Sequence, residues 1–312
     1  MRIVCDQHIP FLVDAIQRHW PDVQIHPMKS EQITPSAVCD ADVLVVRTRT
    51  RIDKQLLANS HVRLVCTATI GYDHIDTAYC DSHHIRWMAC PGCNAQAVCD
   101  YIEEAITAIP FGSNSTIGVV GVGHVGSLVV QMATRKGYHV LLNDPPKGIG
   151  VSLDSIAQNC DIITFHTPLV RDGEYPTYHL CNEAFLRLCK TNALIINAAR
   201  GGIVDEQALL HSGRPYILDT WENEPHINQD VLAHALRASM HIAGYSLHGK
   251  ITATQMCLDA IAQAFNLPPI TTLFPATQPQ GDKAPGWLER ITYQLKTDPG
   301  AFELLRSHYL LR

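Results

Sequence analysis

The sequence predicts an α/β protein with two parallel-sheet domains and a short C-terminal segment. The chain has 312 residues, and a single hydrophobic core becomes unusual near that size. Short apolar runs alternate with amphipathic runs along most of the chain, which is the pattern of strand–helix–strand units around a parallel sheet. One long amphipathic stretch near residue 100 divides this alternation into two series, and each series predicts one domain.

In the first series, apolar runs predict buried strands at residues 2–5, 42–46 and 62–66, and residues 11–20 have the period of a helix. The dividing stretch is itself a helix. It begins at Asn94, a favourable N-cap, and its apolar positions recur every three or four residues until Pro110 stops the pattern.

The second series continues in the same way. The expected strands are residues 116–120, 139–142, 161–166, 193–197 and 216–219, and the expected helices are residues 125–136, 152–159, 231–237 and 251–265. We therefore expect a substrate domain of residues 1–93 and 250–270, a second domain of residues 94–249, and a linker with a short C-terminal segment at residues 271–312. That segment buries too little surface to fold alone, so it must pack on the body or on another subunit.

The composition excludes several classes of function. The formal net charge of −6 argues against nucleic acid and against a membrane surface as partners, because both need a basic footprint. No apolar run approaches the roughly 20 residues that span a bilayer, and the N-terminus lacks the apolar core of a signal peptide, so we expect a cytoplasmic protein. The eleven cysteines are expected to be reduced thiols. Cys90 and Cys93 lack the partners that a zinc site needs, so no metal is expected.

One stretch indicates a dinucleotide. Gly121, Gly123 and Gly126 form the pattern G-x-G-x-x-G between a predicted strand and a predicted helix, and the next strand leads to Asp144. The glycines allow a tight turn, the approach of a pyrophosphate and close packing of helix on strand, while the helix N-terminus favours phosphate. Asp144 can accept hydrogen bonds from ribose hydroxyls and would repel a 2′-phosphate, which favours NAD over NADP, although Lys147 could offset part of that repulsion. The alternative is a glycine-rich turn without a ligand.

Three residues downstream suit one reaction. Arg200 follows an apolar strand, Glu224 lies in "LDTWENEP", and His241 opens the loop "HIAGYSLHGK". Oxidation of a 2-hydroxy acid needs a base for the hydroxyl proton, a cation for the carboxylate and a hydride acceptor, which His241, Arg200 and NAD can supply. Glu224 would hold the imidazole and stabilise its protonated form, with Glu222 as a rival for that role. Each residue taken alone could equally be structural; their joint occurrence after a dinucleotide turn favours catalysis.

The chain resembles the D-isomer-specific 2-hydroxyacid dehydrogenases over nearly its whole length. General features of that family are "GVVGVGHVG", "NAARGGIVDEQAL", "LDTWENEP" and the late histidine. More specific features, such as "VRTRTRID", "TATIGYDHID", "PGCNAQAV", "TFHTPL" and "HIAGYSLHGK", resemble the branch that acts on a phosphorylated sugar acid in vitamin B6 biosynthesis. The resemblance implies a flavodoxin-like substrate domain, a Rossmann NAD domain and a homodimer. Its C-terminal dimerisation segment is shorter here than is usual in that branch.

The resemblance also implies roles for individual residues. Arg200, Glu224 and His241 match catalytic residues, with His241 as proton acceptor or donor. The expected NAD contacts are Gly121, Gly123, His124, Val125, Gly126, Asp144, Thr167, Ala198, Asp219 and Gly244, and the expected substrate contacts are Arg47, Thr48, Thr69 and Tyr245. The substrate phosphate needs cations. If the segment is extended, Arg47, Arg49 and Arg51 would share one face as a phosphate site, or equally as a solvated basic edge.

The expected reaction is therefore the NAD-dependent oxidation of 4-phospho-D-erythronate to 2-oxo-3-hydroxy-4-phosphobutanoate. Two alternatives stay open. One is a dehydrogenase for another D-2-hydroxy acid, such as glycerate or lactate. The other is an NAD-sensing scaffold without catalysis, because related corepressors share this fold.

Overall fold

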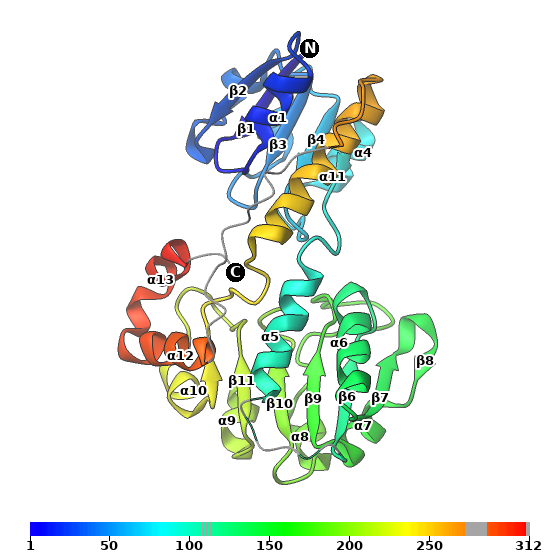
Figure 1. Cartoon of the computed structure of the whole chain (residues 1–312), viewed down its shortest axis with the longest axis vertical. Coiled ribbons are helices and arrows are strands. Elements are labelled where there is room, and N and C mark those ends of the chain that lie inside the picture. The colour runs from blue at the N-terminus through cyan, green and yellow to red at the C-terminus, as the bar shows by residue number, and fades with distance from the viewer. Residues whose placement is uncertain (108, 110–111, 113, 272–285, 310–312) are drawn as a thin grey trace. The chain divides into compact units, whose positions relative to one another are not determined.

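The structure divides the chain into two compact units. The computed structural model describes residues 1–107, 109, 112, 114–271 and 286–309. The first unit comprises Met1–Asn94 and Ser246–Pro279, and the second comprises Ala95–Tyr245 and Gln280–Arg312 (Figure 1). The first division falls one residue beyond the expected one, and the second falls at residue 245 where the sequence suggested 249.

The first unit is a five-stranded parallel sheet with the order β2-β1-β3-β4-β5. Alternate residues of its central strands enter two separate apolar cores: Ile3 and Val43 face one core, and Val4 and Leu44 face the other. Strands buried on both faces read as continuous apolar runs, which is why the sequence revealed them. The strands are β1 (Arg2–Asp6), β2 (Gln24–Met28), β3 (Val43–Val46), β4 (Leu64–Thr67) and β5 (Arg86–Met88).

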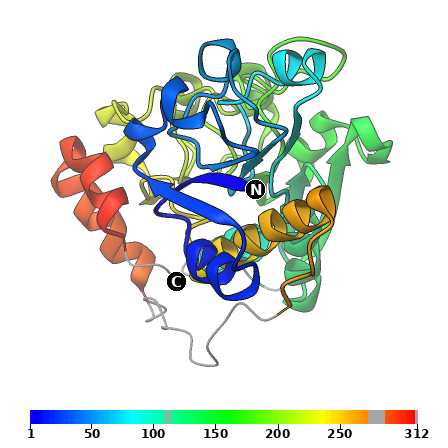
Figure 2. The ribbon, with the colours of Figure 1, turned by 90° about the horizontal axis from the view of Figure 1, so that it is seen from above.

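Helices cover both faces of this sheet. Helices α1 (Leu12–His19) and α11 (Leu247–Phe265) lie against the same core, side by side in Figure 2. Helix α11 starts four residues earlier than its apolar period suggests, because the Ser246 hydroxyl accepts a hydrogen bond from the Gly249 N–H at 2.9 Å and caps the helix. The opposite face carries the short helices α2 (Pro35–Val38), α3 (Lys54–Leu57) and α4 (Thr77–Ser82).

The second unit is a seven-stranded sheet with the order β12-β11-β10-β9-β6-β7-β8, parallel except at the pair β7–β8. From β6 the chain moves outward to β7 and then returns to β9 on the other side. The direction of winding therefore reverses beside β6, where open α/β sheets bind their ligands. The strands are β6 (Thr116–Val120), β7 (His139–Asp144), β8 (Ile149–Gly150), β9 (Ile162–Phe165), β10 (Leu194–Asn197), β11 (Tyr216–Leu218) and β12 (Arg237–Ala238).

The helices of this unit follow the strands in alternation. They are α5 (Ala95–Thr107), α6 (His124–Arg135), α7 (Leu153–Asn159), α8 (Glu183–Leu188), α9 (Glu206–Ser212) and α10 (Gln229–His234). The helix expected at residues 231–237 is wrong at its end, because Arg237–Ala238 form a strand that pairs with β11. This short strand leads directly into the loop that contains His241.

The C-terminal segment packs on the second unit. It forms helices α12 (Trp287–Thr297) and α13 (Phe302–His308), joined by a single 3₁₀ turn (Figure 1). Trp287, Leu288 and Phe302 are at most 5% exposed and belong to the core of this unit. Most of the expected linker, residues 272–285, lies outside the described residues.

No helix within the described ranges is long and apolar enough to cross a bilayer. All eleven cysteines carry free thiols. Where the chain is described, no three histidine, cysteine, aspartate or glutamate side chains are grouped to hold a metal ion.

Candidate active site

The glycine-rich turn joins β6 to α6 and has the form that a dinucleotide requires. Gly121 has a φ of +88°, and a Cβ there would lie 2.8 Å from the carbonyl carbon of His166. A Cβ on Gly126 would lie 1.9 Å from the carbonyl oxygen of Gly121, so only glycine lets α6 pack this closely. A Cβ on Gly123, the N-cap of α6, would meet nothing within 4 Å. The first and third glycines therefore serve the turn itself, while the second leaves open space at the helix N-terminus.

Asp144 is fixed beside this turn. It ends β7 and is 8% exposed, and its Oδ2 accepts a hydrogen bond from the Val122 N–H at 2.8 Å. Lys147 Nζ lies 3.5 Å from the same Oδ2 and donates to the Val122 carbonyl oxygen at 2.6 Å. The carboxylate thus stands where ribose hydroxyls are bound in Rossmann folds, with a lysine against it.

Thr167 provides a test of whether the turn fits a bound cofactor. Its methyl group borders Gly121, and its Oγ1 is buried without a hydrogen-bond partner among the described residues. The preceding His166 is neutral, because burial lowers its pKa to about 3. A buried hydroxyl without a partner is costly unless a ligand satisfies it. Together with the open helix N-terminus and Asp144, this hydroxyl fits the polar groups of NAD. Of the other expected NAD contacts, His124 and Val125 open α6 and Ala198 directly follows β10.

Replacing Asp144 with serine is expected to weaken NAD binding by about 10-fold, the usual worth of a hydrogen bond to a charged group. The same change should narrow the preference for NAD over NADP, because the carboxylate that repels a 2′-phosphate is gone and Lys147 remains. Calorimetric titration of both dinucleotides measures the two effects. A variant with an unchanged ratio of NAD to NADP affinity would show that Asp144 does not select the cofactor.

His241 and Glu224 form the central pair of the site. His241 Nδ1 lies 2.8 Å from Glu224 Oε2, and Glu224 Oε1 accepts a hydrogen bond from the Trp221 N–H at 2.9 Å. The side chains are 30% and 20% exposed, so water still reaches the imidazole. Burial alone would raise the pKa of Glu224, but the hydrogen bond and charge of His241 outweigh it and lower the pKa below its usual value. Glu224 is therefore an ionised partner for the imidazole.

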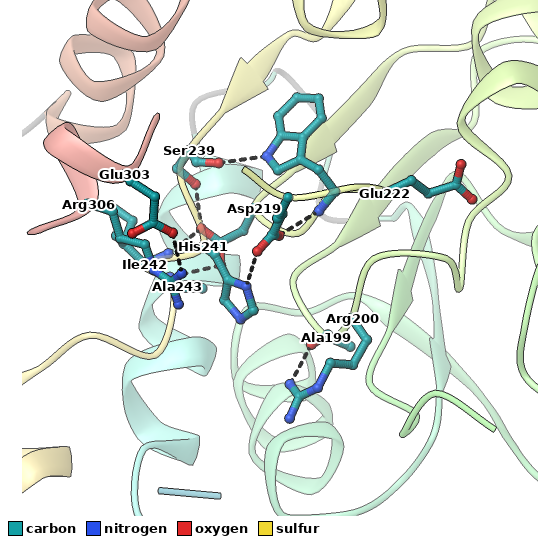
Figure 3. A network of polar contacts seen from close by, with 12 residues as sticks. Ala199, Arg200, Asp219, Glu222, Ser239, His241, Ile242, Ala243, Glu303 and Arg306 are labelled. Atoms are coloured by element: carbon teal, nitrogen blue, oxygen red, sulfur yellow. Dashed lines mark hydrogen bonds and ion pairs between the residues drawn. The ribbon is translucent and has the colours of Figure 1, made fainter. Parts of the chain in front are cut away.

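The loop that presents His241 is held by the buried carboxylate of Asp219 (Figure 3). Its Oδ1 accepts hydrogen bonds from the Ser239 hydroxyl and the Ile242 N–H, each at 2.7 Å, and its Oδ2 accepts one from the Ala243 N–H at 2.9 Å. His241 itself has a φ of +57°, a conformation that costs free energy unless its surroundings enforce it. Asp219 is an expected NAD contact, and the hydrogen-bond partners of its carboxylate among the described residues are Ser239, Ile242 and Ala243. Its position at the end of a buried strand was the only signal in the sequence for such a role.

Arg200 follows β10 in a tight loop. The Asn197 side chain bonds to the carbonyl oxygen of Arg200 at 2.8 Å and to the Ala199 N–H at 3.1 Å. A Cβ on Gly201 would lie 1.9 Å from the carbonyl oxygen of Trp221, so this glycine lets the Arg200 loop touch the loop that carries Glu224. Over the described part of the chain, Arg200 has no ion pair with a carboxylate, and its Nη1 donates to the Ala199 carbonyl oxygen (Figure 3). The guanidinium thus remains available for an anionic ligand.

Glu222, the rival of Glu224, has a different partner. Its carboxylate accepts a hydrogen bond from His179 Nε2, and its backbone N–H donates to Glu206 Oε1 at 2.6 Å. The structure therefore brings Glu224, and not Glu222, to His241. The sequence analysis missed Glu206, which is 4% exposed and holds the loop through the hydrogen bond that it accepts from the Glu222 N–H. An acidic residue at the start of a helix looks like an ordinary N-terminal carboxylate.

Glu206 predicts a pH dependence of stability. Burial, with help from the charges of Glu222 and Glu224, raises the pKa of Glu206 to about 7. The folded protein then keeps a proton that the unfolded chain loses near pH 4.3, so the free energy of unfolding falls as pH rises from about 4.5 through 7. Glu206→Gln cannot ionise and should escape this loss, which amounts to about 3 kcal/mol. Urea unfolding of both proteins between pH 4.5 and 8 measures it; parallel curves would contradict the assignment.

Two of the expected substrate residues, Arg47 and Thr69, have different partners in the first unit. Arg47 forms a two-point ion pair with buried Asp6, at 2.9 and 3.2 Å. Burial would raise the pKa of Asp6, but the hydrogen bonds from Arg47, His8 and Ser30 lower it. Thr69 Oγ1 lies 2.7 Å from the hydroxyl of Thr67. Arg47 is therefore committed to a structural pair within this unit.

The idea that three arginines share one face of an extended segment is wrong. Strand β3 ends at Val46, and the chain then turns, so the alternation of a strand does not continue. Arg49 and Arg51 instead line a hollow of about 380 Å³ together with Thr48, Asp73 and His74. Two guanidinium groups and a hydroxyl at one hollow are suited to an anion.

Comparison with known proteins identifies the family. The sequence model of the D-isomer specific 2-hydroxyacid dehydrogenase, NAD binding domain, matches residues 104–243. The chain is 40% identical to erythronate-4-phosphate dehydrogenase of Bacteroides fragilis, an alignment that covers 100% of this chain and 97% of the relative. It is 38% identical to the protein of that name from Pseudomonas syringae pv. tomato, over 96% of this chain and 80% of the relative. The chain is thus shorter than some members of this branch and nearly as extensive as others.

Two solved structures show the same fold. The NAD⁺-bound 3-phosphoglycerate dehydrogenase of Entamoeba histolytica has a TM-score of 0.70 at 23% identity, over 89% of this chain and 99% of that chain. The D-lactate dehydrogenase of Aquifex aeolicus, complexed with NAD and lactic acid, has a TM-score of 0.65 at 22% identity, over 85% and 96%. The expected fold class, α/β with two parallel-sheet domains, is confirmed. The chain belongs to the D-isomer specific 2-hydroxyacid dehydrogenases, which are NAD-dependent enzymes, in the branch of the erythronate-4-phosphate dehydrogenases.

Proposed function

We propose that this enzyme oxidises 4-phospho-D-erythronate to 2-oxo-3-hydroxy-4-phosphobutanoate. The observation that carries the proposal is the hydrogen bond of 2.8 Å between His241 and Glu224, in a loop that buried Asp219 holds. The choice of substrate is supported by the names of relatives that are 36–40% identical over nearly the full chain.

In this mechanism His241 is the base. Its Nδ1 side faces Glu224, which leaves Nε2 to take the proton from the C2 hydroxyl of the substrate. The ionised Glu224 stabilises the imidazolium that forms and keeps the ring oriented, as carboxylates do beside catalytic histidines. Arg200 binds the C1 carboxylate through two parallel hydrogen bonds and fixes C2 relative to the base. When bound, NAD accepts the hydride that leaves C2.

We propose that the cofactor is held by the turn at Gly121–Gly126, with the N-terminus of α6 at its phosphates and Asp144 at its ribose. Thr167 would donate a hydrogen bond from its buried hydroxyl group to the cofactor. Ala198 and Gly244 border the loops of Arg200 and His241 and would line the same site. Asp219 supports NAD indirectly in this proposal, through the loop that it holds.

For the substrate, we propose contacts from Thr48, Thr69 and Tyr245. The phosphate group is assigned to the hollow with Arg49 and Arg51. Among the described residues Arg49 has no ion pair, and Arg51 has a single-point ion pair with Asp53 at 3.7 Å in place of a two-point pair such as the one that Arg47 makes. Arg47 would contribute its positive charge without leaving Asp6.

The test is a turnover assay with NAD⁺ and a panel of 4-phospho-D-erythronate, D-erythronate, D-glycerate and D-lactate. We expect kcat/KM for the phosphorylated acid to exceed that for D-erythronate by at least about 100-fold, the worth of one or two charged hydrogen bonds. A preference for D-glycerate or D-lactate would assign the enzyme to another 2-hydroxy acid. Binding of NAD with turnover of none of the four would favour an NAD-sensing scaffold.

We further propose a homodimer in which the C-terminal segment contributes to the interface. Tyr293 on α12 and Leu304 on α13 are 73% and 60% exposed, the highest values among large apolar side chains of the described residues. Exposed apolar side chains on neighbouring helices favour burial in a two-fold contact. Light scattering should give twice the 34.5 kDa of one chain, and Tyr293→Glu combined with Leu304→Glu should reduce it to one. A monomeric native protein would refute the proposal.

A further inference from the structure

The C-terminal helix α13 brings an arginine to the active-site loop. Helix α13 is anchored in the core of the second unit by Phe302, which is 1% exposed. One turn further along, Arg306 points back toward the loop that carries His241 (Figure 3). Its side chain is 25% exposed, so much of the guanidinium is removed from water.

The contacts of Arg306 are directed at Tyr245, the proposed substrate contact four residues after His241. Arg306 Nε donates a hydrogen bond to the Tyr245 hydroxyl oxygen at 3.1 Å, and the guanidinium carbon lies 5.5 Å from the centre of the tyrosine ring. Arg306 Nη1 donates to Glu303 Oε1 at 3.2 Å, which holds the other end of the group. A guanidinium held at both ends restricts the ring and the hydroxyl together.

Arg306 also belongs to the electrostatics of the catalytic pair. Burial alone would lower the pKa of Arg306, but the neighbouring Tyr245, Glu303 and Glu224 outweigh it and raise the pKa, so the group stays positive. In return, the charge of Arg306 is one of the influences that keep Glu224 ionised. The C-terminal segment therefore acts on the site by charge as well as by contact.

We propose that Arg306 is a positioning residue of the active site, which orients the Tyr245 hydroxyl as a hydrogen-bond donor to an anionic oxygen of the substrate. A hydrogen bond from a guanidinium uses a lone pair of the phenol oxygen and not its proton, and the adjacent positive charge makes the O–H group a stronger donor. Fixing the ring in advance also removes part of the entropy cost of binding. This inference rests on the proposed function, because it takes Tyr245 as a substrate contact. It makes the C-terminal segment part of the substrate site as well as a candidate interface.

A double-mutant cycle of Arg306→Met and Tyr245→Phe tests this role in the full-length enzyme. We expect each single change to raise the KM for 4-phospho-D-erythronate by about 10-fold or more while kcat falls less than about threefold, since a hydrogen bond to a charged group is lost. The KM of the double variant should be no higher than that of the more impaired single variant, because both changes remove the same interaction. Arg306→Lys should restore part of the affinity, as it keeps the charge without the guanidinium geometry.

The matched control is Arg290→Met, which removes the same charge from an exposed position of α12. It should leave KM unchanged, and the Kd of NADH should be unchanged in every variant. Independent, multiplying effects of the two changes would overturn the proposal. So would an unchanged KM in Arg306→Met, even with a lower melting temperature, since that pattern describes a structural contact only.

The experiment distinguishes a wrong substrate assignment from a wrong role for Arg306. If the native enzyme does not oxidise 4-phospho-D-erythronate but oxidises another acid of the panel, the proposed substrate is wrong. The cycle is then measured with that acid, and the same criterion of non-additive KM effects decides the role of Arg306. If no acid is oxidised, binding of 4-phospho-D-erythronate to the NADH complex by calorimetry replaces KM. Failure of the native protein to bind it would overturn both proposals, because Tyr245 would then have no substrate to contact.

Discussion

Replacing His241 with alanine is expected to lower kcat by about 10²–10⁴-fold, the usual worth of a positioned general base. The reason is the geometry of one pair: Glu224 occupies the Nδ1 side of the ring at 2.8 Å, so in the proposed mechanism the other nitrogen takes the substrate proton. In the direction of oxidation the imidazole must begin neutral, so activity should rise with pH in the native enzyme. The variant should lose that rise. Single-turnover hydride transfer with both ligands saturating is the direct measurement.

Two controls separate catalysis from damage to the fold. The Kd of NAD should be nearly unchanged, because the loop around His241 is held by backbone bonds to Asp219 that alanine retains. His234→Ala, at an exposed histidine that ends α10, should leave the rate unchanged. If the His241 variant transferred hydride within a few-fold of the native rate, the histidine would be structural and the mechanism would have to be abandoned.

The variants Gly123→Ala and Gly126→Ala are expected to differ: the first should lose NAD affinity alone, and the second should lose both stability and NAD binding. At Gly123 a Cβ meets no protein atom within 4 Å, and the backbone φ of −85° suits alanine. The methyl group should therefore leave the melting temperature unchanged while it obstructs the pyrophosphate, weakening NAD by about 10–100-fold, as expected for a steric cost of 1–3 kcal/mol. At Gly126 a Cβ would lie 1.9 Å from the Gly121 carbonyl oxygen, so α6 must move away from its strand.

For Gly126→Ala we expect a loss of stability of at least about 1–3 kcal/mol, together with loss of NAD binding, because the turn itself is distorted. Thermal unfolding and calorimetric titration of NAD, performed on both variants, give the comparison. Gly112→Ala, where a Cβ meets nothing within 4 Å and lies outside the turn, serves as the control for both measurements. Tight NAD binding by Gly123→Ala would show that the open space at the start of α6 is not the pyrophosphate site.

A common physical feature of this site is that buried carboxyl groups hold the loops, while the groups assigned to catalysis in the proposed mechanism are half-exposed. Asp219 and Glu206 are at most 4% exposed and bind backbone N–H groups of the two loops that carry His241 and Glu224. Such contacts fix the reacting groups before the substrate arrives, so less reorganisation is needed during the reaction. Removal of either carboxylate should therefore affect the rate through the position of His241 and Glu224.

The sequence by itself determined the architecture and the chemistry of this protein. Strands such as β1, β3 and β6 are buried on both faces, so their apolar runs are visible without any knowledge of their neighbours. The dinucleotide turn was equally visible, because its glycines are required by local backbone geometry and by a helix and a strand adjacent in sequence. The residue types after the strands, an arginine, a glutamate and a histidine, were sufficient to suggest oxidation of a hydroxy acid.

Only the tertiary structure decided which groups meet. Strand β2 carries the half-exposed sequence "QIHPM", which has no apolar pattern of its own and becomes a strand through its pairing with β1. The choice of Glu224 over Glu222 depends on the path of one loop, and the commitment of Arg47 to Asp6 depends on two adjacent strands. Arg306 lies 61 residues from Tyr245 in sequence. Contacts across such separations are set by the packing of whole elements, and no local pattern of residues records them.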